Sequence, residues 1–404
     1  MKKINESMQV LIAMVLGVLA GIILGEKASI FAPLGEIFIG LIKMLIIPLI
    51  LVSIILGAAA LGKTKSAGKV GIFTIAYYLL TSAVATVLGL IAGSIFKPGL
   101  GVKIPESFIT NADTFAGNQK IAGFWETING IIPSNPFQSL TSGNILQILF
   151  FALFFGIALS TMTDEKQKPL IGALETANDA LIWMIKKILV IAPLGVFGLM
   201  ASSISQFGLD IMVLVLKLFL VFTGTLALIH FGMIPCIVKS FTGISPLKFI
   251  SAMKETQIFA FASASSMATL PVNKTECEAL GVRKEVTAFV LPLGATINMN
   301  GNAMLYALTA VFFAQFYGIE LGMVQYITII ITSVLGAIGT AGVPGPALLI
   351  VAVLISAGIP VTALPLVFGV DRLFDMMRTS TNVFGDASCA VIVESILQKD
   401  EKKL

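Results

Sequence analysis

Charged residues are scarce in this sequence. Only 12% of the 404 residues are charged and 57% are hydrophobic, whereas a soluble globular protein is about 25% charged. Apolar runs near or above the roughly 18 residues that cross a bilayer recur along the chain. The composition therefore excludes a soluble globular protein and predicts an integral membrane protein.

Histidine and cysteine are also nearly absent. Cys236, Cys277 and Cys389 are odd in number and widely separated, so we expect neither a disulfide framework nor a metal site. The only histidine, His230, lies in an apolar run, where packing or a local hydrogen bond is its expected role. With no orienting carboxylate near His230 and no Ser–Lys arrangement, an enzyme using Ser265 or Ser266 as nucleophile does not fit the sequence.

Lysine and arginine gather in short segments between the apolar runs, as the positive-inside rule describes, so the net charge of +4 requires no nucleic-acid partner. These basic clusters predict that both chain ends are cytoplasmic. We expect the protein to lie in the inner membrane of the cell. Both ends inside requires an even number of crossings. Eight apolar segments satisfy this, at about 8–25, 30–61, 69–96, 128–161, 170–203, 209–238, 280–314 and 362–397. We interpret the first as a retained helix because no clean cleavage site follows it.

Two further apolar stretches are interrupted by small residues and prolines. Residues 249–271 are broken by Ser263-Ala264-Ser265-Ser266, and residues 326–354 by Gly339-Thr340-Ala341-Gly342-Val343-Pro344-Gly345-Pro346. Such breaks free backbone groups, which hydrocarbon tolerates only where they are buried in protein or line a cavity. We interpret both stretches as re-entrant hairpins, which are typical of inverted-repeat transporters. A kinked membrane helix is the alternative, and the basic residues on both flanks of the first stretch argue against it.

One face of the last apolar segment carries Asp371, Asp375, Arg378, Asn382 and Asp386. Their spacings of four, three, four and four residues place them within roughly an 80° arc of a helix. Each ionised group at the centre of a bilayer costs about 2.5–3.5 kcal/mol on insertion scales. We therefore expect this face to look into a protein interior or a watery cavity, and we expect the function there.

Arg378 is a permanently charged, forked donor that suits bidentate capture of a carboxylate. Asp375 and Asn382 lie one turn away on either side. An α-amino dicarboxylic acid needs such a set: a cation for its side-chain carboxylate, an anion for its ammonium group and amides for its α-carboxylate. The alternative is that Asp375 and Arg378 form an internal ion pair whose only role is to let the helix insert into the membrane. This alternative leaves Asp371 and Asp386 unexplained.

Hard oxygen atoms are available beside this face from Asp386, Asn382, Asn298 and Asn300, with no thiol or imidazole among them. Such a set suits a hard cation such as sodium. Polar residues in membrane helices often only bridge two helices, so the asparagines alone predict little.

Five stretches of the sequence together form a highly specific set of family motifs: residues 77–82, 263–271, 294–302, 339–345 and 371–386. In them, and in segment lengths over nearly the whole chain, the sequence resembles the glutamate/aspartate transporter family of dicarboxylate and amino-acid:cation symporters. The resemblance implies an all-α polytopic membrane protein with eight transmembrane helices, two re-entrant helical hairpins and inverted repeats. It also implies a homotrimer that works as an elevator.

The resemblance further implies a static scaffold and a mobile transport domain. Scaffold helices 1–2 would occupy residues 1–67 and scaffold helices 4–5 residues 98–207. The transport domain would comprise helix 3 in residues 68–97 and a core in residues 208–404. That core would contain helix 6, hairpin 1 at about 243–276, helix 7, hairpin 2 at about 324–358 and helix 8.

By the same resemblance, Arg378 would bind the substrate side-chain carboxylate and Asp375 the ammonium group. The other implied substrate contacts are Thr379, Asn382, Asn302, Ser265, Ser266, Val343 and Gly345. Sodium ions would be co-transported at three sites, with no organic cofactor. The implied ligands are Gly294, Asn298, Asn382 and Asp386 in the first site; Thr296, Met299, Ala337, Ile338 and Thr340 in the second; and Tyr78, Thr81, Ser82, Asn298 and Asn300 in the third.

The sequence departs from the family pattern at several of these positions. The motif Asn-Met-Asp-Gly-Thr reads Asn298-Met299-Asn300-Gly301-Asn302, so the third cation site lacks its carboxylate and a threonine near the substrate is replaced. Tyr306 stands where relatives that couple to protons and potassium carry glutamate, which argues against that coupling mode. Hairpin 2 reads Gly345-Pro346-Ala347, where the family often has a more glycine-rich tip. We expect fewer coupled cations, with the Asp386 and hairpin-2 sites retained.

The sequence thus predicts a secondary symporter that couples sodium influx, with protons as the alternative cation, to uptake of aspartate or glutamate. A C4-dicarboxylate or neutral amino-acid symporter on the same fold stays open because Asn302 reshapes the side-chain pocket, although Arg378 argues against neutral substrates. An ion channel is the competing class, since it would also explain buried charges and re-entrant hairpins.

Overall fold

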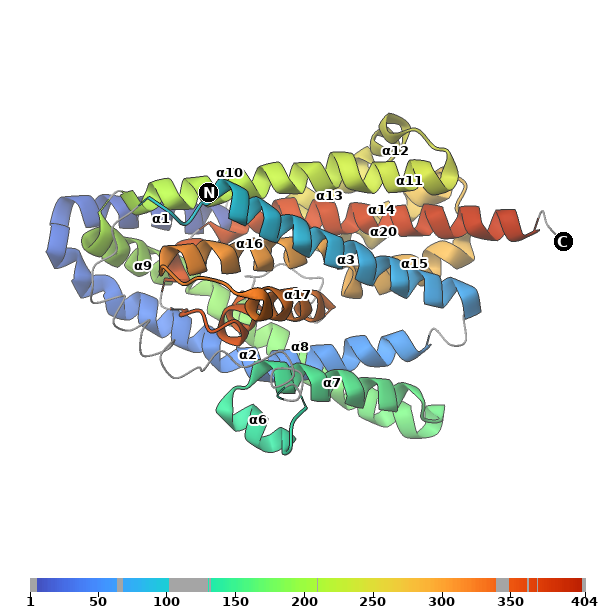
Figure 1. The fold of residues 1–404 in the computed structure, drawn as a ribbon, viewed down its shortest axis with the longest axis horizontal. Helices are drawn as coiled ribbons and strands as arrows, with labels where there is room; N and C mark the ends of the chain where they lie inside the picture. The colour runs from blue at the N-terminus through green and yellow to red at the C-terminus, as the bar shows by residue number, and fades with distance from the viewer. Residues whose placement is uncertain are drawn as a thin grey trace, which may run out of the picture.

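The computed structural model describes residues 6–63, 68–101, 130, 132–208, 210–338, 349–361, 363–368 and 370–401. Within these ranges the regular structure is helical and contains no strand. A helix satisfies its own backbone hydrogen bonds, which is what a chain surrounded by hydrocarbon requires. Figure 1 shows the long helices lying side by side, with many of them following the long axis of the molecule.

One group of helices comes from the first half of the chain. Its members are α1 (Glu6–Leu24), η1 (Gly25–Phe31), α2 (Ala32–Lys63), α6 (Pro136–Ser142), α7 (Ile145–Ser160), α8 (Asp164–Val190) and α9 (Ala192–Phe207). Helix α1 packs along α9, and α2 packs on α7, α8 and α9. Glycine allows the first of these contacts, because a methyl group added at Gly17 would lie 2.6 Å from the carbonyl oxygen of Phe197.

The second group combines α3 with the C-terminal half. Its members are α3 (Gly68–Phe96), α10 (Asp210–Ala227), η3 (Leu228–Met233), α11 (Ile234–Thr242), α12 (Pro246–Ala252), α13 (Lys254–Ser263), α14 (Ser266–Ala279), α15 (Lys284–Ile297), α16 (Asn300–Phe316), α17 (Met323–Ile338), α18 (Leu349–Ser356), α19 (Pro365–Phe368) and α20 (Asp371–Glu401). Helix α3 packs along α16, and α20 contacts α11, α13, α14, α15 and α16. In Figure 1, α20 and α3 run on one side of the molecule and α2, α7 and α8 on the other.

Three helices in the described ranges are long and apolar enough to cross a membrane: Met8–Phe38, Val70–Phe96 and Ile211–Thr242. A fourth candidate is the pair Asp164–Ile188 and Ala192–Ser205, which is bent by 56°. The segments expected at 280–314 and 362–397 are not continuous apolar helices: residues 298–299 interrupt the first, and the second is the short α19 followed by the polar α20. Eight crossings therefore stay a prediction.

Helix–turn–helix structure is found where hairpin 1 was expected. Helix α13 ends at Ser263, and its C-cap Ala264 has a left-handed backbone with φ 50°. Ser265 then caps α14 by accepting a hydrogen bond from the backbone N–H of Ala268 at 3.2 Å. A serine N-cap satisfies one of the free amides at a helix start. Where hairpin 2 was expected, α17 packs on α18, and residues 339–348 between them lie outside the described residues. Whether either hairpin enters and leaves the same membrane face stays a prediction.

Candidate functional site

The polar face of α20 is buried in the protein, as the sequence predicts. Asp371, Asp375, Arg378, Asn382 and Asp386 are each at most 5% exposed. Helices α11, α13, α14, α15 and α16 pack against α20. Since a buried charge is stable only when paired or hydrogen-bonded, the partners of these side chains decide what the site can do.

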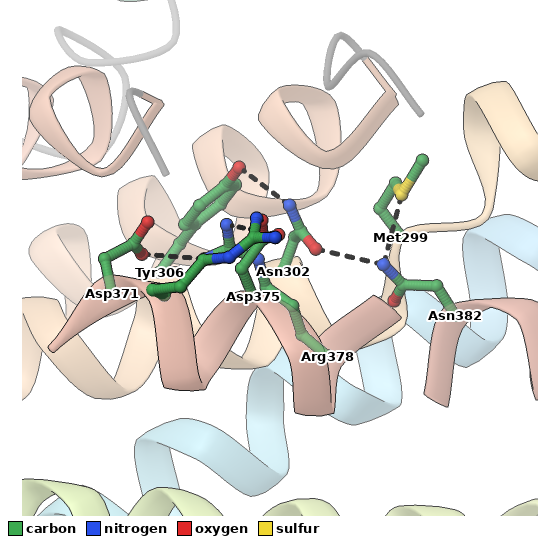
Figure 2. A network of polar contacts seen from close by, with 8 residues as sticks. Met299, Asn302, Tyr306, Asp371, Asp375, Arg378 and Asn382 are labelled. Atoms are coloured by element: carbon green, nitrogen blue, oxygen red, sulfur yellow. Dashed lines mark hydrogen bonds and ion pairs between the residues drawn. The ribbon is translucent and has the colours of Figure 1, made fainter. Parts of the chain in front are cut away.

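Arg378 lies between two aspartates of its own helix. Its Nη1 donates to Oδ1 of Asp371 and its Nη2 to Oδ1 of Asp375, both at 2.9 Å (Figure 2). The second oxygen of Asp375 accepts from Arg372 at 3.3 Å. Two arginines thus balance two aspartates. The internal Asp375–Arg378 ion pair that the sequence offered as an alternative is therefore present. Asp371 takes part in the same pairing, because it also binds Arg378.

The helix that faces α20 is broken at the level of Asn382. Helix α15 ends at Ile297, Asn298 and Met299 leave helical geometry, and α16 begins at Asn300. The C-terminal end of a helix carries partial negative charge and the N-terminal end partial positive charge. At this break the two ends meet, so a cation is favoured beside one and an anion beside the other.

Asn382 joins α20 to this break. Its Oδ1 accepts from the backbone N–H of Gly301 at 2.8 Å, while its Nδ2 donates to the sulfur of Met299 at 3.1 Å and to Oδ1 of Asn302 at 3.0 Å. Asn302 in turn donates from Nδ2 to the hydroxyl of Tyr306 at 3.3 Å. Figure 2 shows this chain of contacts beside the Arg378 guanidinium.

Glycines let the two helices approach this closely. A methyl group at Gly301 would lie 2.8 Å from Cβ of Arg378, and one at Gly294 would lie 2.5 Å from Oδ1 of Asp386. On α20, a methyl group at Gly385 would lie 2.7 Å from Nδ2 of Asn298. No side chain fits at these three positions without displacing a residue of the site.

Asp386 is a buried carboxylate with a single hydrogen bond to the residues that the structure describes. Its Oδ1 accepts from Nδ2 of Asn298 at 2.8 Å, and in the part of the chain that the structure describes it forms no ion pair. The amide oxygen of Asn298 is also buried and has no hydrogen-bond partner among the described residues. The carboxylate and the amide oxygen are both ligands of the kind that a small hard cation takes.

The residues expected at a third cation site come together in part. Ser82 donates to Oδ1 of Asn300 at 2.8 Å, and the hydroxyl of Tyr78 lies close to Gly294 while donating to the carbonyl of Val290 at 2.9 Å. The hydroxyl of Thr81, in contrast, donates to the carbonyl of Tyr77 in its own helix. Asn300 thus holds an amide where a carboxylate would be needed to balance another cation.

The residues expected at the second cation site are described only in part. Met299 and Ala337 pack together in one small buried cluster, and Ile338 is buried and lies against Gly57 of α2. The hydroxyl of Thr296 donates to the carbonyl of Leu293 in its own helix. Thr340, and the expected substrate contacts Val343 and Gly345, lie outside the described residues.

Hairpin 1 lies against α20 through polar contacts. Asn273 donates to the carbonyl of Val383 at 3.3 Å and Ser380 to the carbonyl of Gln257 at 3.3 Å. Ser265 and Ser266, at the start of α14, are buried, as is Thr379 on α20.

His230 has the role expected for it, with ring nitrogens 2.7 Å from Gln257 and 3.1 Å from Thr381, and its ring stacked on Phe384. Sequence reasoning did not assign a role to Arg372, which pairs with Asp375; its three-residue spacing from that aspartate was the available signal.

Comparison with known proteins finds one family model and several relatives that match nearly the whole chain. The sequence matches the model of the sodium:dicarboxylate symporter family over residues 7–396. It is 34% identical to the proton/sodium-glutamate symport protein of Bacillus caldotenax over 400 residues, covering 97% of this chain and 94% of that protein. It is 32% identical to the proton/glutamate-aspartate symporter of Escherichia coli over 420 residues, covering 100% and 96%. The C4-dicarboxylate transport protein of Aeromonas salmonicida is 32% identical over 401 residues, covering 98% and 93%.

Proposed function

The chain belongs to the sodium:dicarboxylate symporter family, a family of secondary transporters and not of enzymes, and we propose that it couples sodium influx to the uptake of aspartate or glutamate. The resemblance to glutamate and glutamate-aspartate symporters supports the substrate class. The buried charges around α20 support the coupling, and they carry the proposal.

The charge of the buried core is the observation on which coupling rests. Asp371 and Asp375 are balanced by Arg372 and Arg378, and Glu394 is balanced by Arg283. Asp386 is the one buried carboxylate among the described residues without an ionic partner. An acidic amino acid, with two carboxylates and one ammonium group, adds a second negative charge. In low dielectric both charges need compensation, so the neutral loaded core holds two monovalent cations.

Substrate recognition would use the groups along α20. The guanidinium of Arg378 is a forked donor that already binds the carboxylates of Asp371 and Asp375, and a side-chain carboxylate of the substrate would bind to the same guanidinium. Asp375 would bind the ammonium group, and Asn382 and Thr379 would bind the α-carboxylate together with backbone groups of Ser266 and Val343. The N-terminal end of α14 adds partial positive charge for the same carboxylate.

Cation binding would use Asp386, with Asn298, Asn382 and the backbone of Gly294. A second cation would bind near Met299, Thr296 and the carbonyls of hairpin 2. At the site around Tyr78, Ser82 and Asn300, the Ser82 hydroxyl meets the neutral amide of Asn300, where the family pattern has a carboxylate. We therefore propose that this site binds no sodium, and that coupling uses two cations for each substrate.

Movement would follow the division of the helices into two groups. The group of α1, α2, α7, α8 and α9 would form the static scaffold of a trimer in the cell membrane. The group around α3, α16 and α20 would move as an elevator, with hairpin 2 opening to admit substrate and sodium favouring its closure. This proposal draws support from the packing, because α3 contacts α16 far more extensively than it contacts the first group.

Uptake of labelled aspartate into proteoliposomes tests this function. We expect saturable uptake that requires a sodium gradient and that glutamate inhibits. Inhibition by succinate but not by glutamate would identify a C4-dicarboxylate transporter instead, which is the function named for the Aeromonas relative. Inhibition by serine alone would identify a transporter of neutral amino acids. Non-saturable flux without a gradient would identify a channel.

A further inference from the structure

We propose that α12 and the end of α11 form a membrane-surface anchor. Its apolar side chain, Leu247, enters the headgroup region of one leaflet, and its three lysines, Lys239, Lys248 and Lys254, bind the phosphates of anionic phospholipids. The inference goes beyond the proposed function, because it concerns the contact of the protein with lipid and does not depend on the substrate.

The anchor directly follows a helix that is long and apolar enough to cross a membrane, Ile211–Thr242. Lys217 and Lys239 are the charged residues of this helix. The uncharged stretch between them, residues 218–238, is about 31 Å long at 1.5 Å per residue. Because the hydrocarbon core of a bilayer is about 30 Å thick, the two lysines mark its edges. Only residues 243–245 separate this helix from α12, which places α12 at the level of the headgroups.

Helix α12 turns an apolar side chain outward. Leu247 is 80% exposed, whereas Phe249 is fully buried and packs on Phe384 of α20, with ring centroids 4.7 Å apart. Residues two apart lie on opposite sides of a helix, so burying Phe249 directs Leu247 away from the protein. Figure 1 shows α12 standing out from the side of the bundle next to α11. An exposed apolar side chain beside basic residues is typical of helices that lie in the membrane interface.

Hydrogen bonds at both ends of α12 fix this orientation. Ser245 caps the helix by accepting from the backbone N–H of Lys248 at 3.4 Å. At the other end, Nε2 of Gln257 donates to the carbonyl oxygens of Ile250 and Met253, both at 3.1 Å. Helix α12 therefore cannot turn Leu247 inward without breaking these contacts.

The charge of the anchor is of one sign. Residues 211–254 contain four lysines and neither aspartate nor glutamate. Lys239, Lys248 and Lys254 are exposed and form no ion pair with any residue that the structure describes. The carboxylate of Glu276 binds two backbone N–H groups at the start of α13. Since each lysine near an anionic leaflet strengthens membrane binding about fivefold, the three together favour anionic headgroups.

A lipid surface fits the anchor better than a folded protein does. A stable protein interface buries about 800 Å² on each partner, whereas the anchor offers two exposed apolar side chains, Phe241 and Leu247. Lipid requires no such area, because the preceding membrane helix already holds the anchor beside the headgroups and raises their effective concentration.

Fluorescence quenching in proteoliposomes of the full-length protein tests the inference. Leu247→Cys is made together with Cys236→Ser, since Cys236 is the exposed native cysteine and Cys277 and Cys389 are buried, and the new cysteine carries a fluorophore. The vesicles are phosphatidylcholine, with or without a third of phosphatidylglycerol, and contain a lipid nitroxide either near the headgroup or deep in the acyl chains. Phosphatidylglycerol should raise quenching by the shallow nitroxide at least about twofold, and the deep nitroxide should quench less.

Removing lysines separates headgroup binding from simple contact with lipid. In Lys248→Gln/Lys254→Gln the increase should vanish, because two lysines account for about 25-fold in binding. The matched control is Lys166→Gln/Lys168→Gln, which removes the same charge from another predicted cytoplasmic segment, where Lys168 pairs with Asp164 at 2.9 Å. It should keep the increase. High salt should abolish the increase in protein with all its lysines, which tests the same charges if the double variant does not fold.

A label on Met323→Cys is the control for position. Met323 is also apolar and 75% exposed, but residues 285–371 around it contain no lysine or arginine, so its quenching should be the same in both kinds of vesicle. Three results at Leu247→Cys would overturn the inference. Equal quenching with and without phosphatidylglycerol would show contact with lipid but no headgroup binding. No quenching in either vesicle would show that the residue faces water or a protein. Stronger quenching by the deep nitroxide would place it in the hydrocarbon core.

Discussion

Asn298 donates a hydrogen bond from Nδ2 to Oδ1 of Asp386 at 2.8 Å, and this contact joins the break between α15 and α16 to the middle of α20. The same Nδ2 lies 3.3 Å from the carbonyl oxygen of Asn382. Because both neighbours are acceptors, the amide nitrogen faces them and the amide oxygen faces away. The contact therefore leaves the amide oxygen of Asn298 without a hydrogen-bond donor and the carboxylate of Asp386 without a counter-ion among the described residues, and both are oxygen groups of the kind that bind hard cations.

Removing the charge of Asp386 should weaken the response to sodium. In Asp386→Asn, the sodium concentration for half-maximal aspartate binding should rise by at least about tenfold, because the buried negative charge that balances the cation is lost. Titrations with aspartate at a series of sodium concentrations measure this half-maximal concentration. The matched control is Glu394→Gln, also a buried carboxylate but paired with Arg283 at 3.0 Å. An unchanged sodium response in Asp386→Asn would contradict the ligand role.

Removing Arg378 should abolish binding of acidic substrates. Loss of a buried, hydrogen-bonded charge partner costs about 2–5 kcal/mol, so aspartate affinity in Arg378→Ala should fall by at least about 30-fold while the protein stays folded. Gel filtration and aspartate titration of the same preparation check both parts. Arg283→Ala is the control, because Arg283 pairs with Glu394 and Glu401 at the far end of α20. Undiminished aspartate affinity in Arg378→Ala would contradict the assignment.

Restoring a carboxylate at residue 300 should add a cation. In Asn300→Asp the loaded core carries one more negative charge, so a third cation is needed to balance it. Reversal potentials in proteoliposomes should then give one more sodium ion per substrate than in the wild type. Asn300→Ser, which also removes the amide but adds no charge, should keep the wild-type number. The same ratio in Asn300→Asp and in wild type would show that Asn300 does not set the number of cations.

Close packing of α16 on α20 can be tested without changing a polar group. In Gly301→Ala the new methyl group would lie 2.8 Å from Cβ and 3.0 Å from the carbonyl oxygen of Arg378, so Arg378 must move and aspartate affinity should fall by at least about tenfold. Gly224→Ala is the matched control, since no atom lies within 4 Å of the added group. It should bind aspartate like the wild type, and equal affinities in both variants would show that the contact of Gly301 with Arg378 does not position the guanidinium for substrate.

The position of the site could be predicted from the sequence, because a costly row of charges at helical spacing has to face inward. The partners of those charges could not. Asp371 and Arg378 are seven residues apart, and whether they pair depends on rotamers and on what covers them. The break at Asn298 and Met299 could not be predicted either, because residues 280–314 are apolar enough to indicate one continuous membrane helix.

Tyr306 shows the same limit from another side. Its place in the sequence indicated only which coupling mode to doubt, whereas its contact with Asn302 depends on the orientation of three amide groups in succession, beginning at the backbone N–H of Gly301. Such an arrangement is set by tertiary packing and has no signature in residue spacing.

Isothermal titration of the purified protein with L-aspartate at several sodium concentrations measures the coupling between cation and acidic amino acid. Linkage requires the slope of log affinity against log sodium concentration to equal the number of ions taken up with the substrate. We expect a slope of about two and no measurable binding when choline replaces sodium. Aspartate binding of the same affinity with and without sodium would contradict it.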